Sequence, residues 1–129
     1  VSIEMIEAVG VEYLPTYFQA LHDLVKPSGS VVIQSISVME AKYAHYCKST
    51  DFIQQYIFPG GHCPSLNAIA GSAAGASLTI HNVEEFGLHY AETLRQWDRK
   101  FIASEEHLLN LGYDDRFIRM WHYYFCFCE

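Results

Sequence analysis

Residues 1–38 read VSIEMIEAVGVEYLPTYFQALHDLVKPSGSVVIQSISV, and their patterns indicate the fold class. Residues 1–6 form a short apolar run, which predicts a strand. Residues 12–25 place apolar side chains three and four positions apart, which predicts an amphipathic helix. Pro15 suits the first turn of that helix, because a residue there needs no N–H for an intrahelical hydrogen bond.

A second strand is predicted after this helix. The proline ring and the glycine in the sequence KPSG at residues 26–29 end the helix. Residues 30–38 are rich in β-branched side chains and nearly continuously apolar, which is typical of a strand buried on both faces of a parallel sheet. Strand, helix and parallel strand in this order indicate the α/β class.

The remainder of the chain is predicted to be mainly helical. The expected elements are a helical segment at residues 51–58, a turn at 59–61, a helix from the N-cap Ser65 to about residue 74, a strand at 77–83, and tail helices at 89–102, from Ser104, and from 114 to about 127. We find no internal repeat and no linker, so residues 1–129 are interpreted as part of one domain.

Composition excludes several classes of protein. Half of the residues are hydrophobic and 15% are aromatic, which is enough apolar surface for a core. The formal charge of -7 repels phosphate backbones, so no nucleic-acid partner is expected. Four cysteines in a chain of this length do not indicate a disulfide framework, and we expect a cytoplasmic location. The uncharged stretch at residues 60–82 is broken by Gly, Pro, Ser and His and does not resemble a membrane span.

Four motifs carry a family resemblance. They are SIEMIEAVG at residues 2–10, LVKPSG at 24–29, YIFPGGHCPS at 56–65 and GLHYAETLRQW at 87–97. In this order they resemble the cyclopropane-fatty-acyl-phospholipid synthases, including the mycolic acid cyclopropane synthases, over essentially the whole chain. These enzymes are class I S-adenosylmethionine (SAM)-dependent methyltransferases.

The resemblance implies a fold and a position within it. The chain would be the C-terminal portion of a doubly wound, Rossmann-like sheet, with strands four and five present and with additional helices that cover the acyl site. The family's Gly-rich SAM loop lies upstream, and no G-x-G occurs here. We therefore expect a chain truncated at both ends, whose SAM site lies mostly outside it and whose activity in isolation is doubtful.

The resemblance also implies the chemistry and its residues. Family members transfer a methylene group from SAM to a cis double bond of an acyl chain, with bound bicarbonate as the base. The implied bicarbonate ligands are Glu7, the N–H of Ile36, the side chain of Gln34, and Tyr90. Glu7, Gln34 and Tyr90 are thus the candidate catalytic residues.

Each of these residues also has a purely structural interpretation. Glu7 follows a strand, where α/β sheets bind ligands, but a carboxylate there also favours the nearby helix N-terminus. Gln34 stands where bacterial members usually have histidine, as does Ala8, and an amide cannot titrate; Gln34 could instead satisfy a buried backbone group. Tyr90 can donate to an anion or simply pack.

No metal site is predicted. His62 and Cys63 lack two further ligands at a recognisable spacing, and the C-x-C pair Cys126 and Cys128 is not a zinc-knuckle spacing. The loop that holds His62 is expected to shape the mouth of the acyl pocket, as the resemblance suggests. The aromatic residues of the tail have helical spacing, which indicates core packing or the lining of an acyl tunnel.

Three functions remain open at this stage. The first is methylene transfer to an unsaturated phospholipid, with peripheral membrane contact. The second is N-methylation of a small amine by an enzyme of the same architecture, although the motif IFPGG at residues 57–61 favours a lipid acceptor. The third is a non-catalytic remnant with an exposed apolar strand edge. The sequence identifies neither the acyl chain, the head group nor the oligomeric state.

Overall fold

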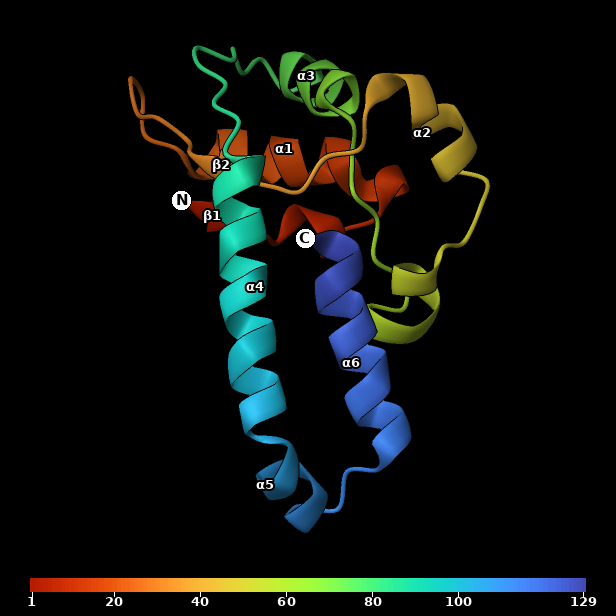
Figure 1. Ribbon diagram of the computed structural model, residues 1–129. Helices are drawn as coiled ribbons and strands as arrows, with labels where there is room; N and C mark the ends of the chain where they lie inside the picture. The colour runs from red at the N-terminus through yellow and green to blue at the C-terminus, as the bar shows by residue number, and fades with distance from the viewer. The chain divides into compact units, whose positions relative to one another are not determined.

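The computed structural model describes residues 1–129, which divide into two compact units, Val1–Asn82 and Val83–Glu129. The first unit contains β1 (Ser2–Ile3), the 3₁₀ turns η1 (Ile6–Ala8) and η2 (Val11–Tyr13), α1 (Leu14–Leu24), β2 (Ile33–Gln34), α2 (Glu40–Tyr46), the π-helical turn η3 (Ile53–Ile57) and α3 (Leu66–Gly75) (Figure 1). The second unit contains α4 (Gly87–Ala103), α5 (Glu105–Asn110) and α6 (Asp115–Cys128). The α/β class is confirmed, with helices predominating.

The sheet consists of two parallel strands. Ser2 lies opposite Ile33 and Ile3 opposite Gln34. The N–H of Ser2 donates to the carbonyl oxygen of Val32 at 2.8 Å, and the N–H of Glu4 donates to that of Gln34 at 2.9 Å. The predicted strand, helix and parallel strand are therefore confirmed, although each strand has only two residues.

The prediction that the second strand is buried on both faces is wrong. Val32 is 58% exposed and Ile36 is 44% exposed. Ile33, in contrast, packs against the core cluster of the first unit. Successive side chains of a strand point to opposite faces, so helices that cover one face bury only alternate residues.

The core of the first unit lies between α1, η1 and α3. Its buried members are Ile6, Leu14, Tyr17, Phe18, Ala73 and Ala76. On α1 they fall at the predicted helical spacing, and Pro15 lies in the first turn as expected. The small residues of α3 allow it to pack closely against α1.

A side-chain hydrogen bond fixes the N-terminal end of α3. The buried Ser65 caps α3, because its hydroxyl accepts the N–H of Ala68 at 3.2 Å, as the sequence predicted.

The predicted helical segment at residues 51–58 is present as the turn η3. The sequence did not predict α2, whose polar and aromatic residues lack a continuous apolar stripe.

The strand predicted at residues 77–83 is wrong. No strand forms there. The carbonyl of Ala73 accepts the N–H of Leu78, which closes the end of α3, and only Leu78 reaches the core cluster. Ile80 and Val83 are 40% and 54% exposed, so the β-branched composition of this segment has no partner strand to stabilise it.

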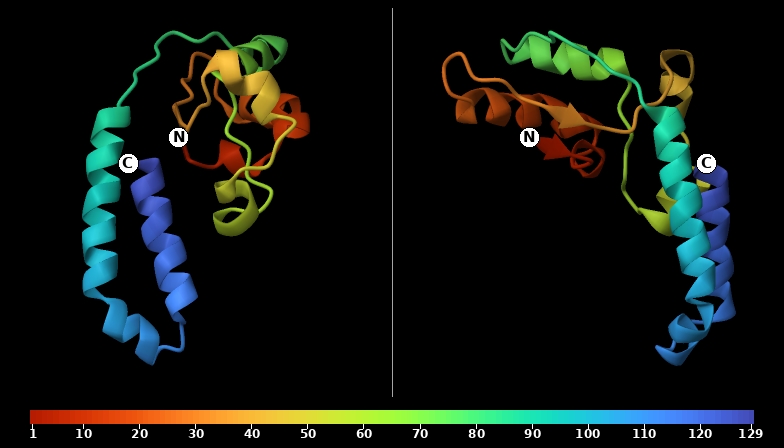
Figure 2. Two further views of the ribbon diagram at one scale, coloured as in Figure 1. Left: turned by 45° about the vertical axis from the view of Figure 1, so that its right-hand side comes forward. Right: turned by 60° about the vertical axis from the view of Figure 1, so that its left-hand side comes forward.

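The second unit is a helical hairpin. Helices α4 and α6 lie side by side in both views of Figure 2 and are joined through α5. All three predicted tail helices are confirmed, and Asp114 caps α6 by accepting the N–H of Phe117 at 2.8 Å. Leu94 is 1% exposed, and the ring of Phe101 contacts those of Phe117 and Phe125. The aromatic tail therefore contributes to packing.

The chain has no helix with the length and apolarity that crossing a bilayer requires.

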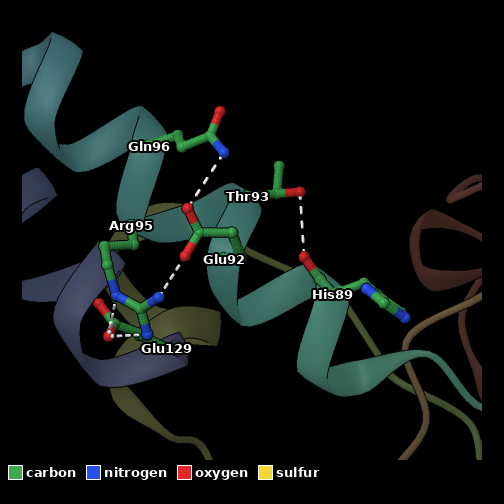
Figure 3. Close-up of polar contacts among 6 residues, drawn as sticks. All are labelled: His89, Glu92, Thr93, Arg95, Gln96 and Glu129. Atoms are coloured by element: carbon green, nitrogen blue, oxygen red, sulfur yellow. Dashed lines mark hydrogen bonds and ion pairs between the residues drawn. The ribbon is translucent and has the colours of Figure 1, made fainter.

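Ion pairs add a polar edge to this hairpin. Figure 3 shows Arg95 on α4 donating to the carboxylates of Glu92 and Glu129. The distance from Nη2 of Arg95 to Oε1 of Glu129 is 2.7 Å. Because Glu129 follows the last turn of α6, this contact ties the C-terminal end of α6 to α4.

Candidate active site

The carboxylate of Glu7 lies directly beyond the two paired strands. Ile6 is 1% exposed and anchors the turn η1, which presents the next side chain to the end of β2. There Oε1 of Glu7 accepts the N–H of Ile36 at 2.5 Å. Two of the residues predicted to share one anion therefore do meet, because parallel pairing places the carboxyl ends of both strands at the same edge.

The second oxygen of this carboxylate has no partner. Oε2 of Glu7 is buried and accepts no hydrogen bond. A buried acceptor left without a donor costs about 1–3 kcal/mol, and more when it is charged. A small ligand with an O–H or N–H group that donates to Oε2 would remove this cost. The observation fits a bicarbonate that shares its proton with Oε2.

The Pro-Gly-Gly loop is attached to the backbone of Glu7. The N–H of His62 donates to the carbonyl oxygen of Glu7 at 2.7 Å. Gly60 has a φ of 82°, a left-handed conformation that favours glycine. A Cβ added to Gly61 would lie 3.0 Å from the carbonyl oxygen of Phe58, so the glycine pair allows the close turn. Its expected role at the mouth of an acyl pocket stays a prediction.

Two tyrosines of α2 line the same loop. The hydroxyl of Tyr43 lies 2.9 Å from Nε2 of His62, and the hydroxyl of Tyr46 accepts the N–H of Cys63 at 3.0 Å. The rings of both tyrosines contact the imidazole of His62. Sequence reasoning missed these tyrosines. Their spacing of three residues, which places them on one helix face, was the available signal.

The side chains of this loop and of the two tyrosines are uncharged near neutral pH. Burial raises the pKa of Tyr43 and that of Tyr46 to about 12, and it lowers the pKa of His62. Burial, and to a lesser degree the charge of Glu7, raises the pKa of the Cys63 thiol. None of these four groups is a cation that would pair with the Glu7 carboxylate.

Gln34 and Tyr90 have other observed contacts. The Nε2 of Gln34 donates to Oε1 of Glu4 at 2.9 Å, rather than to a backbone group. Tyr90 lies on α4 in the second unit, where its ring centroid is 6.5 Å from that of Trp97. Their participation in the anion site stays a prediction.

The fold and this site define an α/β protein with a carboxylate at the carboxyl ends of two parallel strands. The chain resembles a crystal structure of mycolic acid cyclopropane synthase CmaA1 complexed with SAH and CTAB, with a TM-score of 0.86 and 25% identity. The match covers 98% of this chain and 47% of that one.

The family model described as mycolic acid cyclopropane synthetase matches residues 1–129, and the chain belongs to this family. It is 42% identical over 130 residues to the tuberculostearic acid methyltransferase UfaA1 of Mycobacterium tuberculosis, covering 100% of this chain and 30% of that protein. It is 32% identical to the cyclopropane-fatty-acyl-phospholipid synthase of Escherichia coli K12, covering 99% of this chain and 32% of that protein. The chain thus spans about a third of the length of these relatives. The family resemblance read from the four motifs is confirmed.

Proposed function

We propose that this chain is the acceptor-side part of a SAM-dependent enzyme that transfers a methylene group to the cis double bond of an unsaturated phospholipid acyl chain. The observation that carries the proposal is the carboxylate of Glu7, with one oxygen fixed by Ile36 and the other buried without a partner. The name of the Escherichia coli relative supports the phospholipid, and the SAH in the CmaA1 complex supports SAM as the donor.

The residues of this chain would prepare a proton acceptor. When bound, SAM supplies the methyl group and bicarbonate supplies the base that receives the proton lost on ring closure. Glu7 would hold bicarbonate through Oε2, with the N–H of Ile36 keeping the carboxylate in position. Tyr43, Tyr46, His62 and Cys63 are uncharged near neutral pH and provide no competing cation. Gln34 and Tyr90 are proposed as further anion ligands.

A second candidate differs only in the fate of the transferred carbon. The 42% identity to a methyltransferase of tuberculostearic acid favours methylation of an acyl chain without ring closure. Both candidates use the same donor and the same class of acceptor. Because such acceptors reside in bilayers, we propose a cytoplasmic enzyme with peripheral membrane contact in either case.

Replacing the matched segment of the Escherichia coli cyclopropane-fatty-acyl-phospholipid synthase by residues 1–129 tests the proposal. The chimera is expressed in a strain without its own synthase, and the phospholipid acyl chains are analysed by mass spectrometry and NMR. We expect acyl chains that gain one CH₂ group and show cyclopropane protons. A methyl branch without a ring supports the second candidate. Unchanged lipids from a folded, SAH-binding chimera, or a methylated amine in their place, would contradict the proposal.

A further inference from the structure

Three different metal-ligating side chains meet on the hairpin of the second unit. His122 and Cys126 lie four residues apart on α6 and therefore on one face, and Asp98 lies on α4. One ligand atom from each of them, a carboxylate oxygen, an imidazole nitrogen and a thiol sulfur, lies within 4.8 Å of the other two. Nδ1 of His122 is 2.6 Å from Oδ1 of Asp98 and 3.9 Å from Sγ of Cys126.

The packing of the hairpin determines this arrangement. Leu94, one turn before Asp98 on α4, is 1% exposed, and Ile118, one turn before His122 on α6, is 5% exposed. These buried residues turn the polar residues toward the partner helix. The ion pair of Arg95 with Glu129, drawn in Figure 3, connects the same two helices one turn further along. Asp98 and the α6 ligands are thereby fixed in register.

The donor set suits zinc. Thiolate, imidazole and carboxylate are the protein ligands of Zn²⁺, and ligand atoms about 2.0–2.3 Å from one ion lie roughly 3.3–3.8 Å apart in a tetrahedron. The distances from Nδ1 of His122 to Asp98 and to Cys126, 2.6 and 3.9 Å, lie just below and just above this range. A rotation of the His122 side chain would widen the shorter distance. The Asp98 side chain is 19% exposed and that of His122 is 48% exposed, so an ion has access from solvent.

We propose that Asp98, His122 and Cys126 form a three-ligand Zn²⁺ site, with water as the fourth ligand. Coordination would release the thiol proton of Cys126 to solvent, while neutral His122 would bind through Nδ1 with its ring proton on Nε2, so that a thiolate, an imidazole and the Asp98 carboxylate hold the ion. The ion would join α4 to α6 and stabilise the hairpin. The sequence did not predict this site, because Asp98 lies 24 positions from His122 and the spacing matches no familiar zinc motif.

Titration of the full 129-residue chain with Co²⁺, in a phosphine reductant, tests this site. Co²⁺ reports a cysteine ligand by a thiolate-to-metal charge-transfer absorption in the near ultraviolet. We expect this absorption to saturate at one equivalent and to disappear when Zn²⁺ displaces Co²⁺. Zn²⁺ should also raise the thermal midpoint of the chain, in the absence of any lipid or SAM.

Matched variants separate this site from other thiols. Cys126→Ser should abolish the charge-transfer absorption, and Asp98→Ala should weaken Co²⁺ binding at least about tenfold. Cys47→Ser removes another exposed cysteine, in the first unit, and should leave the titration unchanged. Circular dichroism checks that each variant is folded, and His122→Gln replaces any variant that is not. An absent absorption in the unsubstituted chain, or an unchanged one in folded Cys126→Ser, would overturn the proposal.

Discussion

Substitution of Glu7 by Gln separates the chemistry of the carboxylate from its structural role. Gln has nearly the same shape, and its carbonyl oxygen can still accept the N–H of Ile36, which lies 2.5 Å from Oε1 of Glu7. The amide nitrogen then replaces Oε2, the buried oxygen without a partner. The variant therefore exchanges an anionic acceptor for a neutral donor at the atom proposed to bind the base.

The effect of this substitution on stability is expected to be much smaller than its effect on catalysis. A hydrogen bond to a charged group contributes about 1.5–3 kcal/mol and a neutral one about 0.5–1.5 kcal/mol, so the contact with Ile36 loses roughly 1 kcal/mol. Removal of a buried charge offsets part of this loss. We expect the free energy of unfolding to change by no more than about 1 kcal/mol. Loss of a positioned acid-base group typically slows catalysis about 10²–10⁴-fold, and we expect product formation to fall in this range.

The chimera described above provides the activity assay, and denaturant unfolding of the 129-residue chain provides the stability assay. Glu12→Gln is the matched control, because it removes the same charge from an exposed position in η2. It should leave both measurements unchanged. Near-normal product formation by a folded Glu7→Gln chimera would refute the role of this carboxylate, and loss of folding in Glu7→Gln alone would refute the stability reasoning.

Three further predictions concern stability. Burial lowers the pKa of His62 from 6.5, so the unfolded chain binds a proton at this residue more readily than the folded chain does. The contribution of neutral His62 to stability should therefore be complete above pH 6.5 and should decline as the pH falls below it. The unfolding midpoints of His62→Gln should show a shallower decline over this pH range. Ser65→Ala removes the cap of α3 and should lower the free energy of unfolding by about 1 kcal/mol, which Ser72→Ala within the same helix should not reproduce. Leu94→Ala empties a position that is 1% exposed and should cost roughly 2–5 kcal/mol in urea unfolding of the second unit, whereas the exposed Leu88→Ala should cost far less.

Local patterns determined much of the secondary structure. The spacing of apolar residues in α1, the caps Ser65 and Asp114, and the tail helices all depend on interactions between residues three or four positions apart, which the sequence displays directly. The motifs also determined the family. The lengths of the strands, and the absence of a strand at residues 77–83, could not be predicted in this way. A strand is stabilised by a partner strand that is distant in sequence.

The contacts of the functional side chains depend on how distant segments of the chain pack together. Glu7 and Ile36 are 29 residues apart, and the parallel register of β1 and β2 brings them together. The same register directs Gln34 to Glu4. Asp98 and His122 meet because two helices pack in one register. The sequence specifies which groups are present, but the distances between them, and hence their chemistry, depend on how separate elements pair and pack.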